Sequence, residues 1–217
     1  VVAFGTPSAR KVVFTCRHHA CESVAAYSLE GAVAALLRDE EYCAQHETIV
    51  VPFVDVDGVE TGEQGKSRLP HDHNRDYIDA PLYATTRRLK ALADAGTTDV
   101  LIDFHCPARW GGVHDHMSLI GLPSPQAERQ QRFSEILAET DGEIPYRVAD
   151  NVPFGTHWNV GAGMATSCSA YFAAHGAALA FSFEHPYFGA GERPYDAAAL
   201  RNFGERISRA LRRYLQA

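Results

Sequence analysis

Three stretches of the chain combine an apolar run with polar residues at its carboxyl end. The central run, residues 100–105, reads Val-Leu-Ile-Asp-Phe-His, and the other two occupy residues 11–16 and 178–183. Apolar runs of this length predict buried strands of a largely parallel sheet. In open α/β sheets, ligands bind beyond the carboxyl ends of the strands. We therefore expect the polar residues at these three ends, which include His105 and Glu184, to meet at one site.

Helical patterns alternate with these strands. The last one follows Asp196 as its cap and carries a single apolar stripe, which indicates core packing rather than a binding surface. That stripe consists of Leu200, Phe203, Ile207, Leu211 and Tyr214. Further helices are predicted at residues 22–38, 81–95, 124–139 and 167–175, where apolar residues recur at helical spacing or capping signals frame the segment.

Two more strands and two long loops complete the pattern. Strands are predicted at 48–54 and 116–121, and Pro52 inside the first argues for an edge position or a bulge. Residues 55–79 show no apolar period and are rich in His, Asp, Asn and Arg. Structureless stretches of this length are usually functional or disordered, and we favour a functional loop. Residues 151–166, glycine-rich and aromatic, are expected to form a loop over the site.

The element pattern predicts the fold class. Strands that alternate with helices indicate one α/β domain over residues 1–217, with a mixed, mostly parallel sheet and helices on both faces. The chain has 217 residues, 46% of them hydrophobic, which fits a single globular core. Because the sequence begins at Val1 rather than at methionine, we expect it to lack an upstream segment.

Charge and cysteine content narrow the function classes. The net charge is -7 and no basic run occurs, which argues against nucleic acid as a partner. No apolar run approaches the roughly 20 residues of a membrane span, and no signal-peptide layout is visible. The five cysteines are odd in number and show no framework of spacings. This pattern favours reduced thiols and a cytoplasmic setting.

His19, Glu22 and His105 form a candidate metal set. His19 and Glu22 are three residues apart, so at the first turn of a helix they lie on one face. Two histidines and a glutamate with an open position form a ligand set of catalytic zinc. His18 is an alternative to His19. It lies four residues before Glu22, and this spacing also puts two side chains on one face of a helix. Cys106 points away from His105 in a strand, so we interpret it as a small buried apolar residue.

Two charged residues are candidates for other roles. Glu184 ends an apolar strand, where a carboxylate must be paired, bound to a metal or raised in pKa. Beside a zinc-bound water it can act as general base, and the alternative is an ion pair with an arginine of the last helix. Arg75, next to Asn74, can hold a substrate carboxylate through its guanidinium fork. Its alternative is a surface ion pair with Asp72 or Asp76.

These residues occur in an order that resembles the zinc carboxypeptidase (M14-like) family, within the superfamily that includes the aspartoacylase/succinylglutamate desuccinylase-like deacylases. The matching motifs are Arg-x-His-x-x-Glu-Ser at 17–23, Asp-Gly-Val at 57–59, Asp-x-Asn-Arg-Asp-Tyr at 72–77, Asp-x-His at 103–105, and Phe183, Glu184, Pro186 and Tyr187. They span most of the chain in a single order.

The resemblance implies a role for each matching residue. Zinc would be bound by His19, Glu22 and His105, which selects His19 over His18. The substrate's terminal carboxylate would be bound by Asn74 and Arg75, and Asp72 would orient a zinc histidine. Glu184 would be the base that activates water.

The chain also departs from the family pattern. The family's oxyanion-stabilising arginine has no clear counterpart, although Lys66 and Arg68 lie nearby, and Tyr171 is one candidate for its capping tyrosine. The expected function is removal of a C-terminal residue from a peptide, with a small amide that carries a free carboxylate as the other substrate type. The alternatives are an N-acyl amino acid deacylase and a metal-free binding module on the same fold.

Overall fold

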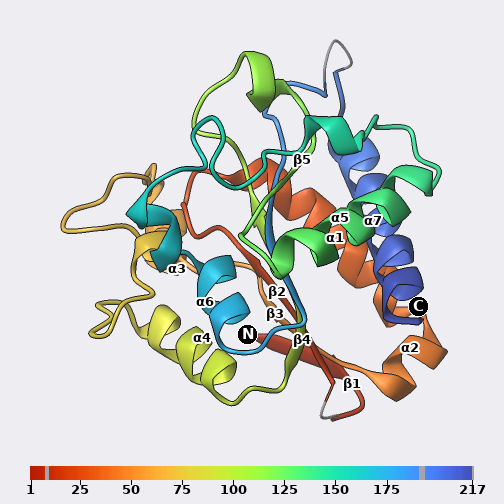
Figure 1. The fold of residues 1–217 in the computed structure, drawn as a ribbon, viewed down its shortest axis with the longest axis horizontal. Coiled ribbons are helices and arrows are strands. Elements are labelled where there is room, and N and C mark those ends of the chain that lie inside the picture. Colours follow the sequence, from red (N-terminus) through yellow and green to blue (C-terminus); the bar gives the residue numbers. More distant parts are fainter. Residues whose placement is uncertain (8–9, 191–193, 217) are drawn as a thin grey trace.

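The computed structural model describes residues 1–7, 10–190 and 194–216, and its strands form one sheet (Figure 1). The order across the sheet is β1-β3-β2-β4-β6-β5. The strands β3, β2, β4 and β6 are parallel, whereas β1 and β5 pair antiparallel at the two edges. Their bounds are β1 Val2–Gly5, β2 Lys11–Cys16, β3 Glu47–Val51, β4 Thr98–His105, β5 Ser118–Ile120 and β6 Leu179–Glu184. The predicted mixed, mostly parallel sheet is confirmed.

Helices cover both faces of this sheet, as predicted (Figure 1). One face packs against α1, α5 and α7, and the other against α4 and α6. The helices are α1 Ser23–Leu37, α2 Glu40–Gln45, α3 Val56–Thr61, α4 Ala84–Asp94, α5 Gln126–Glu139, α6 Cys168–Ala174 and α7 Ala197–Gln216. Short 3-10 turns are η1 His73–Arg75, η2 Gly112–Asp115, η3 Val148–Asp150 and η4 Ala162–Thr166. None of the helices within these described ranges is both long enough and apolar enough to cross a membrane.

The side chains of the central strands alternate between the two cores. In β4, Val100, Ile102 and Phe104 belong to the core under α1 and α7, while Leu101 belongs to the core under α4 and α6. Because successive strand residues point to opposite faces, His105 leaves β4 on the same face as Leu101. Cys106, the next residue, points to the opposite face. It lies in the core under α1 and α7 and is 1% exposed, as expected for a small apolar residue.

The last helix packs tightly on the first. A Cβ atom on Gly204 of α7 would lie 1.9 Å from the backbone oxygen of Ser28 in α1, so only glycine permits this approach. Four residues of the predicted apolar stripe are buried in the core: Leu200, Phe203, Ile207 and Leu211. The fifth, Tyr214, is partly buried and packs against this core. The stripe is therefore core, as predicted.

Some elements differ from the sequence expectation. β3 stops at Val51, directly before Pro52, because proline has no N–H for the ladder. β3 is not an edge strand, since the short strand β1, which the sequence analysis did not identify, pairs outside it. The expected loop at 55–79 contains α3, whose first turn is capped by Asp55 Oδ1 accepting from Gly58 N at 3.0 Å.

Candidate metal centre and its cavity

The strands β2, β4 and β6 lie side by side, so their carboxyl ends bring distant residues together. His105 ends β4 and is the register partner of Glu184 at the end of β6. After β2 the chain turns through Arg17, whose φ of 60° lies in the left-handed region. The Arg17 Nε donates to Ala20 O at 2.8 Å and holds this turn. The turn delivers His19 to the sheet edge just ahead of α1.

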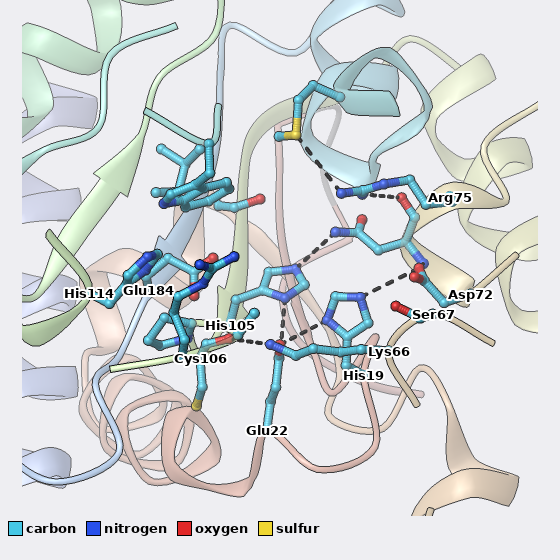
Figure 2. A pocket seen from close by; sticks show the side chains of 18 residues that line it. His19, Glu22, Lys66, Ser67, Asp72, Arg75, His105, Cys106, His114 and Glu184 are labelled. Carbon is cyan, nitrogen blue, oxygen red and sulfur yellow. Dashed lines mark hydrogen bonds and ion pairs between the residues drawn. The ribbon is translucent and has the colours of Figure 1, made fainter. Parts of the chain in front are cut away.

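His19, Glu22 and His105 converge on one point (Figure 2). Glu22 Oε1 lies 2.8 Å from His19 Nδ1, and Glu22 Oε2 lies 2.8 Å from His105 Nδ1. The three residues are buried, and one ligand atom from each lies within 4.8 Å of the others. They line a cavity of about 250 Å³. Two imidazole nitrogens and a carboxylate that converge beside a cavity fit a divalent ion with an open coordination position.

His18 and Asp103 form a second group behind His105. The His18 ring, fully buried, has Nδ1 2.9 Å from Asp103 Oδ1 and Nε2 2.8 Å from the Tyr77 hydroxyl. Asp103 Oδ2 lies 2.7 Å from His105 Nε2. The spacing of His18, Asp103 and His105 would also suit an ion, but neither His18 nor Asp103 lines the cavity. Asp103 therefore holds the outer nitrogen of His105, which leaves Nδ1 facing Glu22.

Asp72 lies behind His19 in the same way that Asp103 lies behind His105. Its Oδ1 lies 3.4 Å from His19 Nε2 and accepts from Asn74 N at 2.9 Å. Burial opposes ionisation of Asp72, but the interaction with His19 and the charge of Arg75 lower its pKa to about 2. Each candidate metal histidine thus has a carboxylate against its outer nitrogen, an arrangement that fixes ring orientation in metal sites.

Glu184 faces the same cavity and is half-buried. Its Oε2 is buried without a hydrogen-bond partner among the described residues. Burial raises the pKa of Glu184 to about 7, against the opposing charge of His105. No arginine of the last helix neutralises it, because Arg206 donates instead to the carbonyls of Leu137 and Ile144. A carboxylate with a free oxygen and a pKa near neutrality suits a general base.

The structure distinguishes Lys66 from Arg68. Lys66 Nζ lies 2.6 Å from Glu22 Oε1, donates to Cys106 O at 2.8 Å and lines the cavity. Arg68 donates to Asp55 and Glu63, and it is not among the residues that line the cavity. Of the two cations proposed from the sequence, only Lys66 reaches the candidate centre.

Asn74 and Arg75 line the cavity from the turn η1. Asn74 Oδ1 accepts from Cys168 N at 3.0 Å, which fixes its amide. Arg75 Nη1 donates to Asn74 O at 2.9 Å, and Nη2 lies 3.9 Å from Met164 Sδ. Among the described residues, Arg75 forms no ion pair with Asp72 or Asp76, although its charge helps to lower the pKa of Asp72. Figure 2 shows Arg75 on one side of His105, with Glu184 and His114 on the other.

Several cavity residues were not identified in the sequence. Arg109 and His114 come from the loop after β4, whereas Trp158 and Met164 come from the 151–166 segment that was expected over the site. No periodicity or motif marks these residues. Tyr171, the candidate capping tyrosine, lies outside the cavity lining and donates to Asp94 Oδ1 at 2.6 Å.

Solved structures share this fold. A metallo-carboxypeptidase from Burkholderia cenocepacia matches with a TM-score of 0.77 at 20% identity, over 99% of this chain and 60% of that one. A Pseudomonas aeruginosa metallo-carboxypeptidase in complex with (2-guanidinoethylmercapto)succinic acid matches with a TM-score of 0.77 at 18% identity, over 98% and 59%. The mDAP-bound form of Helicobacter pylori Csd4, a D,L-carboxypeptidase, matches with a TM-score of 0.67 at 14% identity, over 100% and 54%.

Sequence comparisons add no closer relationship. No protein-family model matches the chain, and no curated protein matches it. The chain spans about 60% of the length of the first metallo-carboxypeptidases that it matches in structure. At these identities the likeness concerns the fold. The chain therefore has the metallo-carboxypeptidase fold, and its candidate metal residues lie at the carboxyl ends of the central strands.

Proposed function

We propose that this chain is a zinc-dependent carboxypeptidase, which hydrolyses the last peptide bond of a substrate with a free C-terminal carboxylate. The observation that carries the proposal is a single cavity lined by His19, Glu22 and His105, by the base candidate Glu184, and by Arg75, which has no ion-pair partner within the described residues. These groups are the parts that a hydrolase of this type requires: metal ligands, a base and an anchor for the carboxylate. The names of the structural neighbours support the same reaction class.

His19, Glu22 and His105 would hold the zinc ion. Bound there, zinc would supply a Lewis acid that polarises the scissile carbonyl and acidifies a water molecule. Asp72 and Asp103 keep the two imidazole rings in one orientation, because each carboxylate contacts the nitrogen that faces away from Glu22.

Glu184 moves the proton. Its free Oε2 accepts a proton from the attacking water, and its pKa of about 7 lets the same carboxyl group release that proton to the leaving amine. Lys66 Nζ lies beside Glu22 at the cavity wall, where its charge stabilises the negative charge that develops on the carbonyl oxygen. In this proposal Lys66 takes the role that an arginine has in the family.

Arg75 and Asn74 select the substrate. A guanidinium that lines the cavity and forms no ion pair among the described residues can bind a carboxylate of the substrate bidentately. An N-acyl amino acid also carries such a carboxylate, so a deacylase would use the same residues. The scissile bond decides between the two, since a peptidase releases an amino acid from a peptide acyl group and a deacylase releases it from a simple acyl group.

The experiment is a comparison of matched substrates. We would measure release of the C-terminal residue from N-blocked dipeptides, from their C-terminal amides and from N-acetyl amino acids, before and after zinc removal with a chelator. We expect hydrolysis of the free-acid dipeptides, loss of activity with the chelator and recovery with zinc. Faster hydrolysis of N-acetyl amino acids would favour the deacylase. A zinc-loaded protein that hydrolyses none of them would contradict the proposal and favour a non-catalytic module.

A further inference from the structure

Arg109 is a second arginine in the lining of the cavity. It lies on the loop after β4, lines the same cavity as the candidate metal residues, and is exposed to solvent. Within the described part of the chain, no hydrogen bond or ion pair involves it. Some other surface arginines pair with carboxylates, as Arg38 does with Glu205 at 2.9 Å. A guanidinium that lines the cavity and forms no ion pair in the described structure is available to a ligand anion.

Arg109 and His114 come from the same segment after β4, and both line the cavity. Burial and, after it, the charge of Arg109 lower the pKa of His114. Figure 2 shows His114 beside Glu184, across His105 from Arg75. The His114 ring stacks on Trp158, with ring centroids 6.3 Å apart and planes inclined by 20°. Among the described residues, the cavity thus has two guanidinium groups without an ion pair, Arg75 from η1 and Arg109 from the segment that also carries His114.

The charge balance of the cavity favours a substrate with two negative charges. The cavity lining includes three basic residues, Lys66, Arg75 and Arg109, and three acidic ones, Glu22, Asp72 and Glu184. A zinc ion adds two positive charges to this balanced set. One substrate carboxylate leaves the occupied cavity positive, whereas two carboxylates neutralise it. This local excess contrasts with the net charge of -7 for the whole chain.

We propose that Arg109 binds a second carboxylate of the substrate, on the acyl side of the scissile bond. The inference rests on the proposed function, in which Arg75 holds the C-terminal residue and Glu184 lies next to the bond that breaks. The region beyond Glu184, where His114 lies, then receives the acyl part. The substrate carries its extra carboxylate there, either as an aspartate or glutamate side chain or as a succinyl cap.

The test is a double-mutant cycle, in which Arg109 is replaced in the protein and the proposed second carboxylate is replaced in the substrate. Two substrate pairs share a C-terminal leucine: N-blocked Glu-Leu against Gln-Leu, and succinyl-leucine against butanoyl-leucine. We would measure kcat/KM on the zinc-loaded wild type and on Arg109→Gln. We expect the wild type to prefer the acidic member of at least one pair about tenfold, which corresponds to about 1.4 kcal/mol, and Arg109→Gln to lose most of this preference. A preference in the first pair identifies an acidic residue, and one in the second identifies a succinyl cap.

Arg88→Gln is the matched control. Arg88 is exposed on α4 and does not line the cavity, so its loss changes the net charge equally without touching the site. This variant should keep the wild-type preference. Equal rates on both members of both pairs, or a preference that survives in Arg109→Gln, would overturn the inference while leaving the proposed peptidase intact. A wild type that hydrolyses none of the four substrates would overturn both.

Discussion

Asp103 Oδ2 lies 2.7 Å from Nε2 of His105, and the two buried residues come from the same strand, two positions apart. Because residues i and i+2 of a strand point to the same face, the sequence Asp-x-His places a carboxylate directly beside the imidazole. The contact leaves Nδ1 of His105 facing Glu22, which is the orientation that metal binding requires. Asp103 is itself held by Thr15 and His18.

Replacement of Asp103 by asparagine should therefore weaken metal binding. Loss of a carboxylate behind a metal histidine typically costs about 10–100-fold in affinity, and we expect a change of this size for Asp103→Asn. The zinc dissociation constant, measured by competition with a chelator, checks the prediction. Asp99→Asn is the control, because Asp99 lies in the same strand and pairs with Arg10 outside the cavity. Equal zinc affinity in the wild type and Asp103→Asn would contradict this role.

Glu184→Gln should keep the metal and lose turnover. The amide has nearly the same shape as the carboxylate but cannot accept the proton of water, and loss of a general base typically lowers kcat about 10²–10⁴-fold. Zinc content and kcat would be measured on the same preparation. The exposed Glu30 of α1, replaced by glutamine, serves as the control. Near-normal kcat in a zinc-loaded Glu184→Gln would show that another residue is the base.

The pH profile should report the ionisation of Glu184. Burial raises the pKa of its carboxyl group to about 7, and only the ionised form can accept a proton. The kcat/KM should therefore rise with pH and level off above this pKa. Bound zinc would lower the pKa of Glu184, so the midpoint of the rise should lie at or below about pH 7. A profile that is already level well below the midpoint of an ordinary glutamate would argue against Glu184 as the base.

Lys66→Ala should lower kcat more than it raises KM. Removal of one group that stabilises an oxyanion costs about 10²–10³-fold in kcat, because the interaction strengthens in the transition state. Lys66→Arg should recover part of the loss, since it restores the positive charge. Arg68→Ala is the comparison, because Arg68 lies two residues away but donates to Asp55 and Glu63 outside the cavity. Equal kcat values for the wild type and Lys66→Ala would exclude this role for Lys66.

Binding of the substrate carboxylate by Arg75 can be measured as a coupling free energy, from kcat/KM of the wild type and of Arg75→Ala on free-acid and amidated substrates. If the charge pair forms in the closed cavity, its truncation costs about 2–5 kcal/mol, or roughly 30- to several-thousand-fold in kcat/KM. Arg75→Ala should show this loss on free-acid substrates and little change on the matched amides, which are poor substrates already. A coupling under about 0.5 kcal/mol, the scale of an exposed pair, would mean that Arg75 does not bind the carboxylate.

The sequence predicts those parts of the fold and site that depend on local periodicity. β2 is recovered residue for residue, and the three strand ends that carry His19, His105 and Glu184 do meet. β1 was missed because it is four residues long, exposed and paired to a strand distant in sequence. α3 was missed because an Asp-Gly pair usually indicates a turn, whereas here the cap of Asp55 begins a short helix.

The remaining site residues depend on loop conformation. Lys66 and Arg68 have the same charge and lie two residues apart, so no local pattern could show which of them reaches the cavity. Arg109 and His114 follow a strand at irregular spacing, and tertiary packing alone brings them into the lining of the cavity that Glu184 faces. Asp103 is different: the sequence analysis named it only within the Asp-x-His motif, although the period of two along a strand puts it on the same face as His105.

Zinc content tests the central claim most directly, because every proposed step needs the ion at His19, Glu22 and His105. Elemental analysis would be done on the purified wild type, on His105→Ala and on His175→Ala, a control at the end of α6 outside the cavity lining. We expect about one zinc ion per chain in the wild type and in His175→Ala, and loss of the metal in His105→Ala, which keeps only two ligands. Full zinc occupancy in His105→Ala would contradict the account, because the metal would then be bound elsewhere.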